Sequence, residues 1–254
     1  MPPTADALRP PPPEAIESAS RWVGELRGAL HEVIIGQEEL IDALLIGLLT
    51  GGHVLLEGVP GLAKSLAVSS LAGAVHGTFS RLQFTPDLLP SDLVGTEIDN
   101  AREGTFQVRK GPLFANFVLA DEVNRAPAKV QSALLEVMAE RQVSIGFETH
   151  PVPDPFLVLA TQNPIESEGV YPLPEAQRDR FLMKVQVGYP TPQEEIEIVT
   201  RMGVDPPEPR QVLDAEQLVA LQRRADEVYV DRGVIDYAVD VVHATREPAE
   251  HGLS

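Results

Sequence analysis

The sequence predicts an α/β fold, in which a parallel sheet flanked by helices is followed by a smaller helical unit. Short apolar segments with the length of strands alternate with longer segments that carry apolar residues at helical spacing. Beyond residue 190 the strand-like segments stop and only helical patterns continue. Alternation of this kind is typical of a parallel sheet that is covered on both faces.

Two helical patterns precede the first predicted strand. Apolar residues recur at helical spacing over residues 14–33, and the pattern returns over residues 37–49, after Gly36. We therefore expect two helices before the sheet begins.

Five predicted strands are short and mostly apolar, at residues 54–57, 81–85, 117–121, 156–161 and 183–187. The helices expected between them cover residues 65–75 and 128–140. Ligand chemistry in a parallel sheet gathers at the carboxyl ends of the strands. Gly58, Asp121 and Asn163 all fall at such ends, so we expect them to lie at one edge of the sheet.

Two segments interrupt the alternation and have the pattern of β-hairpins inserted into the core. Residues 96–111 carry period-two apolar residues on both sides of an Asn-Ala-Arg-Glu-Gly turn. Residues 142–152 alternate apolar and polar residues around Gly146.

The C-terminal part is predicted to be helical at residues 193–202, 214–228 and 234–246, with prolines between the first two helices. Residues 190–254 hold fourteen acidic residues against six arginines, an excess of eight. Solvated helix faces explain such an excess, and the alternative is a docking surface for a basic partner. We divide the chain into a disordered Pro-rich tail (1–13), an α/β core (14–189) and a helical domain (190–254).

Composition excludes several classes of function. The formal net charge of −18 and the pI near 4.6 argue against a surface that neutralises a nucleic-acid backbone. Cysteine is absent, which excludes disulfides, thiolate metal sites and a cysteine nucleophile, and which fits a cytoplasmic location. The N-terminus lacks the pattern of a signal peptide, and the longest uncharged stretch, residues 43–56, is too short to span a bilayer. We expect no membrane anchor.

The most informative motif is Gly-Val-Pro-Gly-Leu-Ala-Lys-Ser at residues 58–65, between the first strand and a helix. A loop in this place directs backbone N–H groups and the positive end of the helix dipole at one point, which suits phosphate oxygens. Lys64 then adds a charge for the outer phosphates, and the Ser65 hydroxyl is a ligand for Mg²⁺. The alternative is an ordinary glycine-containing turn. Ala63 replaces the usual glycine, which costs little if residue 63 is helical.

Two adjacent acids, Asp121 and Glu122, end the third predicted strand. Alternation directs their side chains differently, so that Asp121 would hold Mg²⁺ through its water shell and Glu122 would orient or deprotonate the attacking water. An acid at a strand end indicates by itself only the end of a strand. Together with the loop at residues 58–65, the pair predicts hydrolysis of a nucleotide triphosphate.

Two further residues are candidates for catalysis. Asn163 follows the fourth strand, where its amide would bridge the attacking water and the γ-phosphate; the alternative is an Asn in a turn before Pro164. Arg180 follows a short predicted helix and could reach the nucleotide of a neighbouring subunit, where a guanidinium stabilises developing charge. A solvated surface arginine is the alternative.

Three segments together resemble the MoxR family of AAA+ ATPases: residues 58–65, residues 118–131 (Val-Leu-Ala-Asp-Glu-Val-Asn-Arg-Ala-Pro-Ala-Lys-Val-Gln) and residues 160–166 (Ala-Thr-Gln-Asn-Pro-Ile-Glu). The resemblance extends over residues 33–246 and implies an AAA+ P-loop NTPase core with two inserted hairpins and a partial helical lid. The hairpins correspond to the helix-2 insert and the pre-sensor hairpin, and the family tolerates Ala63.

The resemblance also assigns roles to single residues. It implies that Asp121 and Glu122 form Walker B, that Asn163 is sensor 1 and that Arg180 is the arginine finger. Mg²⁺ would be held by Ser65 and Asp121. The nucleotide-binding residues, which include Walker A and the segment near adenine, would be Ile35, Gly36, Gly58, Val59, Pro60, Gly61, Leu62, Ala63, Lys64, Ser65 and Leu66.

For the assembly, the resemblance implies a homo-oligomeric ring, a hexamer, with ATP and Mg²⁺ between subunits. It implies a chaperone-like role in maturing partner protein complexes, often with a von Willebrand factor A (VWA) domain partner. Family members usually continue into lid helices with a Gly-Ala-Ser-Pro-Arg stretch that supplies sensor 2. This sequence stops at Ser254 without that stretch, so it is either truncated or lacks the sensor 2 arginine, and in both cases we do not expect full activity and ring stability. Arg178 stands where an apolar residue is common.

The leading hypothesis is an ATP-hydrolysing remodeller of protein complexes. One alternative is a nucleotide-dependent interaction switch with little turnover. Another is a chelatase-like or helicase-like AAA+ motor, because such relatives share both hairpins, although the net charge weighs against DNA as cargo.

Overall fold

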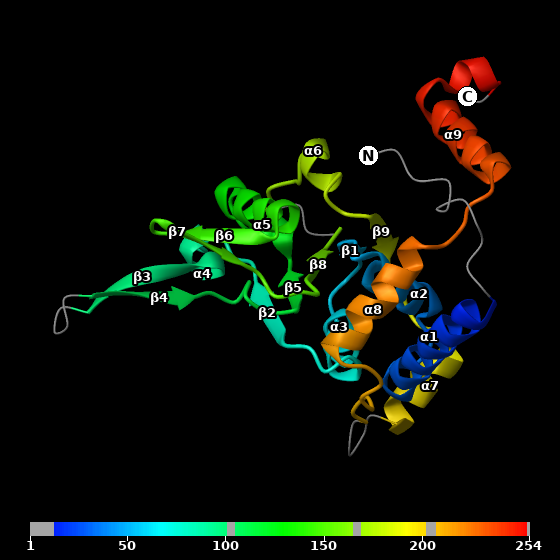
Figure 1. The fold of residues 1–254 in the computed structure, drawn as a ribbon, viewed down its shortest axis with the longest axis horizontal. Helices are drawn as coiled ribbons and strands as arrows, with labels where there is room; N and C mark the ends of the chain where they lie inside the picture. The colour runs from blue at the N-terminus through cyan, green and yellow to red at the C-terminus, as the bar shows by residue number, and fades with distance from the viewer. Residues whose placement is uncertain (1–12, 101–104, 165–168, 202–206, 253–254) are drawn as a thin grey trace.

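The computed structural model describes residues 13–100, 105–164, 169–201 and 207–252. The predicted tail lies outside these ranges, apart from Pro13, which begins the first helix. The predicted α/β class is confirmed: a parallel sheet stands between layers of helices, a hairpin projects at one end of the molecule, and a helix stands apart at the other (Figure 1).

The central sheet has five parallel strands in the order β2-β5-β8-β1-β9. Four strands match the predicted segments to within one residue, whereas β2 lies two residues earlier than the predicted 81–85. Their bounds are β1 (Val54–Glu57), β2 (Phe79–Gln83), β5 (Phe117–Asp121), β8 (Leu157–Gln162) and β9 (Met183–Gln186).

Helices follow the predicted apolar patterns closely. Their bounds are α1 (Pro13–Val33), α2 (Glu38–Thr50), α3 (Lys64–Ala74), α4 (Pro90–Val94), α5 (Ala128–Glu140), α6 (Glu175–Arg178), α7 (Pro192–Arg201), α8 (Ala215–Asp226) and α9 (Arg232–Arg246), with short 3₁₀ turns η2 (Val123–Arg125) and η3 (Pro248–His251). The side chain of Asp214 accepts from the Gln217 backbone N–H and so caps α8. Asp231 caps α9 in the same way.

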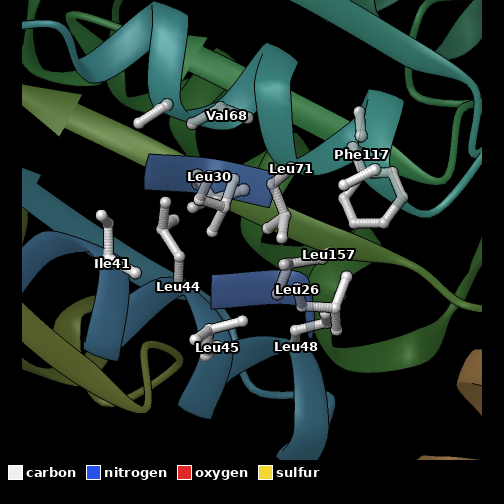
Figure 2. Close-up of a cluster of buried hydrophobic side chains, with 14 of the residues drawn as sticks. Leu26, Leu30, Ile41, Leu44, Leu45, Leu48, Val68, Leu71, Phe117 and Leu157 are labelled. Carbon is white, nitrogen blue, oxygen red and sulfur yellow. The ribbon is translucent and has the colours of Figure 1, made fainter. Parts of the chain in front are cut away.

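Alternation along the strands divides the apolar residues between two cores. In β5, Phe117 and Leu119 face one cluster, and Val118 and Ala120 face the other. The first cluster packs under α1, α2 and α3, and Figure 2 shows its leucines gathered together, with Phe117 at one side of the group. Both faces of the sheet are therefore covered, as the continuous apolar strands require.

The segment after residue 190 shares the first of these cores. Leu213, Leu218 and Leu221 are buried in the cluster that contains α1, α2 and α3. The backbone N–H groups of Val212 and Leu213 both donate to the carbonyl of Ala74 at the end of α3. These contacts pack part of the helical segment on the α/β core. The domain boundary at residue 190 remains a prediction.

The second core lies under α5 and the hairpin of β6 (Gln142–Ile145) and β7 (Glu148–Pro151). The other predicted hairpin forms from β3 (Gly95–Asn100) and β4 (Thr105–Lys110) and projects from the body (Figure 1). Both hairpins are antiparallel, as the sequence predicted. The turn of the β3–β4 hairpin, residues 101–104, lies outside the described residues.

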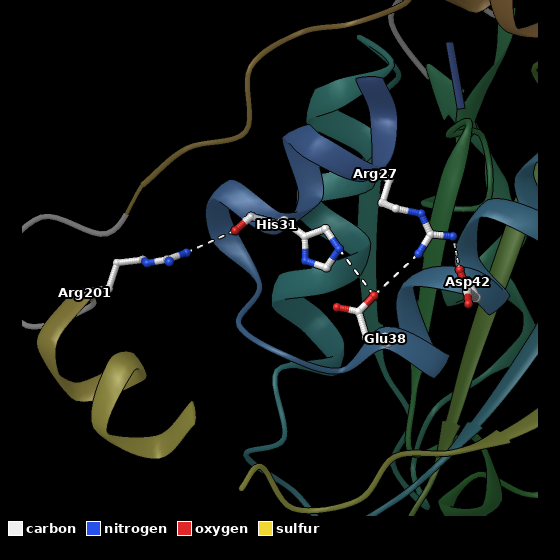
Figure 3. A network of polar contacts seen from close by, with 5 residues as sticks. All are labelled: Arg27, His31, Glu38, Asp42 and Arg201. Carbon is white, nitrogen blue, oxygen red and sulfur yellow. Dashed lines mark hydrogen bonds and ion pairs between the residues drawn. The ribbon is translucent and has the colours of Figure 1, made fainter. Parts of the chain in front are cut away.

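A polar network joins α1, α2 and α7 on one surface (Figure 3). Arg27 is paired with Asp42 and lies 3.5 Å from Glu38, and the His31 ring is 3.4 Å from the same Glu38 carboxylate. Arg201 donates to the carbonyl of His31 at 3.0 Å and so satisfies the C-terminal end of α1. Because these side chains are partly exposed, we expect the network to orient the helices rather than to stabilise them strongly.

His53 is a buried polar residue at the start of β1. Its Nδ1 accepts from the Val158 backbone N–H at 3.0 Å, and its Nε2 lies 3.2 Å from the carbonyl of Met138. Burial, followed by the nearby charge of Arg141, lowers the pKa of His53 from 6.5 to about 4. The neutral ring therefore connects β1, β8 and α5.

The backbone conformation of residue 63 differs from the helical one that the sequence-based expectation assumed. Ala63 is not helical: it has φ 57° and ψ 10°, the left-handed conformation, and stands immediately before α3. A side chain with Cβ is disfavoured there by about 1–2 kcal/mol. Alanine in place of the usual glycine therefore destabilises this loop conformation.

Helix α9 has no buried residue and stands away from the body of the molecule (Figure 1). Its apolar side chains Val234, Ile235, Val241 and Val242 are all exposed. None of the helices in the described part of the chain is both long and apolar enough to cross a membrane.

We predict that His53 lowers stability as the pH falls from about 7 toward 4, and that the first part of this loss occurs between about pH 7.5 and 5.5. With a folded pKa of about 4 against 6.5, its contribution is complete above the unfolded pKa and is lost as the pH falls toward the folded pKa. The loss over this interval is about 1.4 kcal/mol. Urea unfolding of wild type and His53→Asn measures it, because the difference between the two proteins should shrink as the pH falls. A constant difference would contradict the assignment.

We also predict that Ala63→Gly stabilises the protein by about 0.5–1 kcal/mol, because glycine adopts the left-handed conformation without the Cβ contact. Urea unfolding at neutral pH measures the change. Ala67→Gly inside α3 is the matched control, and there glycine should destabilise by about 1 kcal/mol. Destabilisation by both substitutions would show that Ala63 is not strained.

Candidate functional site

The largest group of polar residues from the sequence-based predictions meets in one cleft at the carboxyl edge of the sheet. The cleft has a volume of about 350 Å³. It is lined by Pro60, Gly61, Ala63, Lys64, Ser65, Leu66, Arg81, Gln83, Asp121, Glu122, Thr161 and Asn163. These residues come from the loop before α3, from the first turn of α3, from β2, and from the ends of β5 and β8 or the residues that directly follow them.

Two positions in the loop between β1 and α3, residues 58 and 61, require glycine. Gly61 has φ +87°, and a Cβ there would meet open space, so glycine is required by conformation rather than by crowding. Gly58 is required by crowding, since its Cβ would lie 2.7 Å from the carbonyl oxygen of Val187. Helix α3 begins at Lys64, so its first N–H groups face the cleft lined by this loop.

Lys64 is the buried cation of the cleft, with 8% of its surface exposed. Its Nζ donates to the carbonyl of Gly58 at 2.5 Å, which folds the side chain back over its own loop. Burial lowers the pKa of Lys64, and the charges of Asp121 and Glu122 oppose this shift. The ammonium is thus bonded to its own loop, and the negative charges of the two acids favour its charged form.

Asp121 ends β5 with both carboxylate oxygens engaged. Oδ1 accepts from the Thr161 hydroxyl at 2.6 Å, and Oδ2 accepts from the Arg81 guanidinium at 2.5 Å. Its side chain is only 12% exposed, whereas that of Arg81 is 53% exposed. The acid is therefore fixed on the buried side by a hydroxyl and on the open side by a cation.

Glu122 lies one residue beyond β5 and has side-chain partners different from those of Asp121. It has φ 57° and ψ 48°, the left-handed conformation, and its backbone N–H donates to the Thr161 hydroxyl at 2.8 Å. Its Oε2 accepts from Gln83 at 2.6 Å and lies 3.2 Å from Nε of Arg125. Two side chains thus set the position of this carboxylate.

Asn163 lies one residue beyond β8 and is 7% exposed. It lines the cleft together with Lys64, Asp121 and Glu122. The register explains this, because β8 pairs with both β1 and β5, so that the ends of all three strands lie together.

Other predicted site residues lie outside the lining of the cleft. Arg180 is exposed and follows α6, where its backbone N–H donates to the carbonyl of Gln177 at 3.3 Å. Ile35 and Gly36 lie in the turn between α1 and α2, and a Cβ on Gly36 would meet the carboxylate of Glu194. The adjacent Gln37 donates to the carbonyl of Gly188, which ties this turn to the end of β9. The loop residues Gly58, Val59 and Leu62 also lie outside the lining, and Val59 and Leu62 pack into the first core.

Sequence reasoning missed Arg81, Gln83 and Thr161, which all contact the two acids. A signal for the first two exists in the sequence, because polar residues at positions 81 and 83 share one face of a strand. Their partners could not be deduced without the strand order, which places β2 beside β5.

The oxygens in the cleft fit Mg²⁺. The Ser65 hydroxyl and the Asp121 carboxylate are hard ligands, which Mg²⁺ prefers, and both line the same cleft. Among the described residues, no group of three or more His, Asp or Glu side chains gathers into a metal site. A metal held here would therefore take most of its ligands from water and phosphate, as Mg²⁺ commonly does.

Comparison with known proteins agrees with this geometry. The sequence model of the ATPase family associated with various cellular activities (AAA) matches residues 53–183. Chaperone MoxR1 of Mycobacterium tuberculosis is 58% identical over 246 residues, which cover 96% of this chain and 65% of that protein. Protein YeaC of Bacillus subtilis is 46% identical over 222 residues, which cover 86% of this chain and 69% of that protein.

A solved structure agrees as well. A crystal structure of a proposed ATPase from Cytophaga hutchinsonii has a TM-score of 0.85 and 48% identity, covering 94% of this chain and 74% of that one. The chain spans slightly less than two thirds of the length of Chaperone MoxR1. Both the sequence and the fold place this protein in one group: the chain belongs to the MoxR family of AAA+ ATPases.

Proposed function

We propose that this chain binds ATP with Mg²⁺ in the cleft between the 58–65 loop and β5, and that it hydrolyses the γ-phosphate. The observation that carries the proposal is the meeting of Lys64, Asp121, Glu122 and Asn163 in one cleft. Membership of an ATPase family supports the same reaction.

Binding would rest on the loop and its lysine. The N–H groups at the start of α3 and the positive end of its dipole suit phosphate oxygens. Lys64 would exchange its bond to the Gly58 carbonyl for a charge-assisted bond to phosphate. Ser65 and Asp121 would hold Mg²⁺, which neutralises charge on the phosphates when bound. Ile35 and Gly36 would lie near the adenine.

Hydrolysis would depend on Glu122 and Asn163. Glu122 has the carboxylate that can orient and deprotonate a water molecule, and it is held apart from Asp121 by Gln83 and Arg125. Asn163 would bridge that water and the γ-phosphate. Both side chains line the cleft that contains Lys64, which supports their joint action on one phosphate.

The proposed assembly is a ring, a hexamer, in which Arg180 of one copy reaches the nucleotide of the next. The position of Arg180 outside the cleft of its own chain supports this role in trans. The similarity to Chaperone MoxR1 supports a protein client. We also propose a VWA-domain protein as a partner and a cytoplasmic location. The net charge of −18 does not favour nucleic acid as the cargo.

One observation favours a second function, a nucleotide-dependent switch with little turnover. The Glu122 carboxylate is paired with Gln83 and Arg125, so it must exchange one of these bonds before it can serve a water molecule. A protein that keeps these bonds would bind ATP and change its partner affinity without hydrolysing it quickly.

We predict that Glu122→Gln slows steady-state phosphate release by about 10²–10⁴-fold, because the amide cannot accept the proton of the water. ATP binding should persist, since Gln retains the size of the side chain. The matched control is Glu136→Gln on the exposed face of α5, which should release phosphate as wild type does. Equally slow release by wild type and Glu122→Gln would favour the switch over the ATPase.

We further predict that Lys64→Ala and Arg180→Ala fail in different ways. Lys64→Ala should weaken ATP binding by about tenfold or more, because a buried charge-assisted contact is lost. Arg180→Ala should bind ATP normally but lose about 10³-fold in turnover by assembled rings. Calorimetry measures the ATP affinity of each variant, and phosphate release measures its turnover. The control is Arg178→Ala, since Arg178 pairs with Glu175 on the same short helix. Equal loss of affinity in both variants would show that Arg180 is misassigned.

A further inference from the structure

We propose that Arg81 is a positioning residue that competes with Mg²⁺ for the Asp121 carboxylate, and that it thereby sets the concentration of Mg²⁺ at which the site binds nucleotide. This inference rests on the proposed nucleotide site and adds a residue to it. Arg81 belongs to none of the predicted motifs.

The geometry gives Asp121 a single oxygen for exchange. Oδ1 accepts from the Thr161 hydroxyl, and that hydroxyl also accepts from the Glu122 backbone N–H, so this bond is part of the fold. Oδ2 accepts from Arg81 at 2.5 Å on the open side of the cleft. A hydrated Mg²⁺ held by Asp121 would need the same open side, so the guanidinium and the metal are alternative partners of one carboxylate.

The positive charges in the cleft also support competition between Arg81 and Mg²⁺. Arg81 and Lys64 both line the cleft, and a divalent cation that approaches Asp121 meets two positive charges. The Arg81 side chain is 53% exposed and is carried on a long flexible stem, whereas the Asp121 side chain is 12% exposed. The Arg81 guanidinium can therefore move away while the Asp121 carboxylate stays in place.

Because β2 lies beside β5, two side chains of β2 contact the two adjacent acids. Arg81 and Gln83 lie on the same face of β2, and they reach Asp121 and Glu122 respectively on the neighbouring β5. The two adjacent acids thus have separate partners on β2, Arg81 for Asp121 and Gln83 for Glu122, and Glu122 also pairs with Arg125 from the turn that follows β5.

The test is the dependence of nucleotide binding on Mg²⁺, measured with a fluorescent, non-hydrolysable ATP analogue. Each protein is studied at an analogue concentration scaled to its own Kd in EDTA, so that a change in phosphate affinity alone does not shift the result. We expect Arg81→Gln to reach half-saturation at about threefold to tenfold lower Mg²⁺ than wild type. Arg81→Lys keeps the charge without the planar fork and should fall between the two.

Arg125→Gln is the matched control. It removes an equal charge from the same region, but its 3.2 Å contact is with Glu122 rather than Asp121. Its Mg²⁺ dependence should match that of wild type, whereas a general effect of charge would shift both variants alike. Thermal unfolding of each variant in EDTA shows whether the fold is retained, and the Arg81→Lys variant gives a second reading if Arg81→Gln is unstable.

The outcomes separate this inference from the proposed function. If wild type binds the analogue and Arg81→Gln has the same Mg²⁺ dependence, the competition does not exist although the nucleotide site does. If Arg81→Gln needs more Mg²⁺, then Arg81 supports metal binding, and the inference is wrong. If wild type binds no analogue at any concentration of Mg²⁺, the proposed function and this inference fall together.

Discussion

The hydrogen bonds that Thr161 makes across to β5 are the constraint on which the site depends. Its hydroxyl donates to Asp121 and accepts from the backbone N–H of Glu122, so one side chain on β8 fixes both acids. The register brings this about, because β5 and β8 pair in parallel up to Ala120 and Ala160 and place the following residues side by side. A slip of one residue would turn the acids to the wrong faces of the sheet.

The two cores hold that register in place. Adjacent residues of β5 point into opposite clusters, so neither face of the strand can move without losing buried apolar contacts. The same packing carries the start of α3, because its apolar face closes the first core. The loop between β1 and α3 is thus fixed at both ends, and this fixes the direction of the helix N-terminus. The position of the cleft follows from the packing of the sheet.

Much of this arrangement could be predicted from the sequence, for identifiable reasons. The apolar strands and helical patterns predicted the α/β class, and the 58–65 motif predicted Lys64. The strand ends predicted Asp121, Glu122 and Asn163, since polar residues directly after buried strands must lie at one edge. The contacts of Arg81 and Gln83 could not be predicted, because they depend on β2 standing beside β5. The left-handed conformation of Ala63 was missed because the closed loop imposes it against the preference of alanine. The roles of Ile35, Gly36 and Arg180 depend on ligand and assembly, which neither the chain pattern nor its own fold determines.

The most direct test of the central claim is a crystal structure of this protein with Mg²⁺ and a non-hydrolysable ATP analogue. Our account predicts phosphate oxygens within hydrogen-bonding distance of the backbone N–H groups at the start of α3 and of Lys64, with the metal on the side of Ser65 and Asp121. It predicts the γ-phosphate between Glu122 and Asn163. A nucleotide bound elsewhere, or phosphates directed away from the lysine and the two acids, would contradict it.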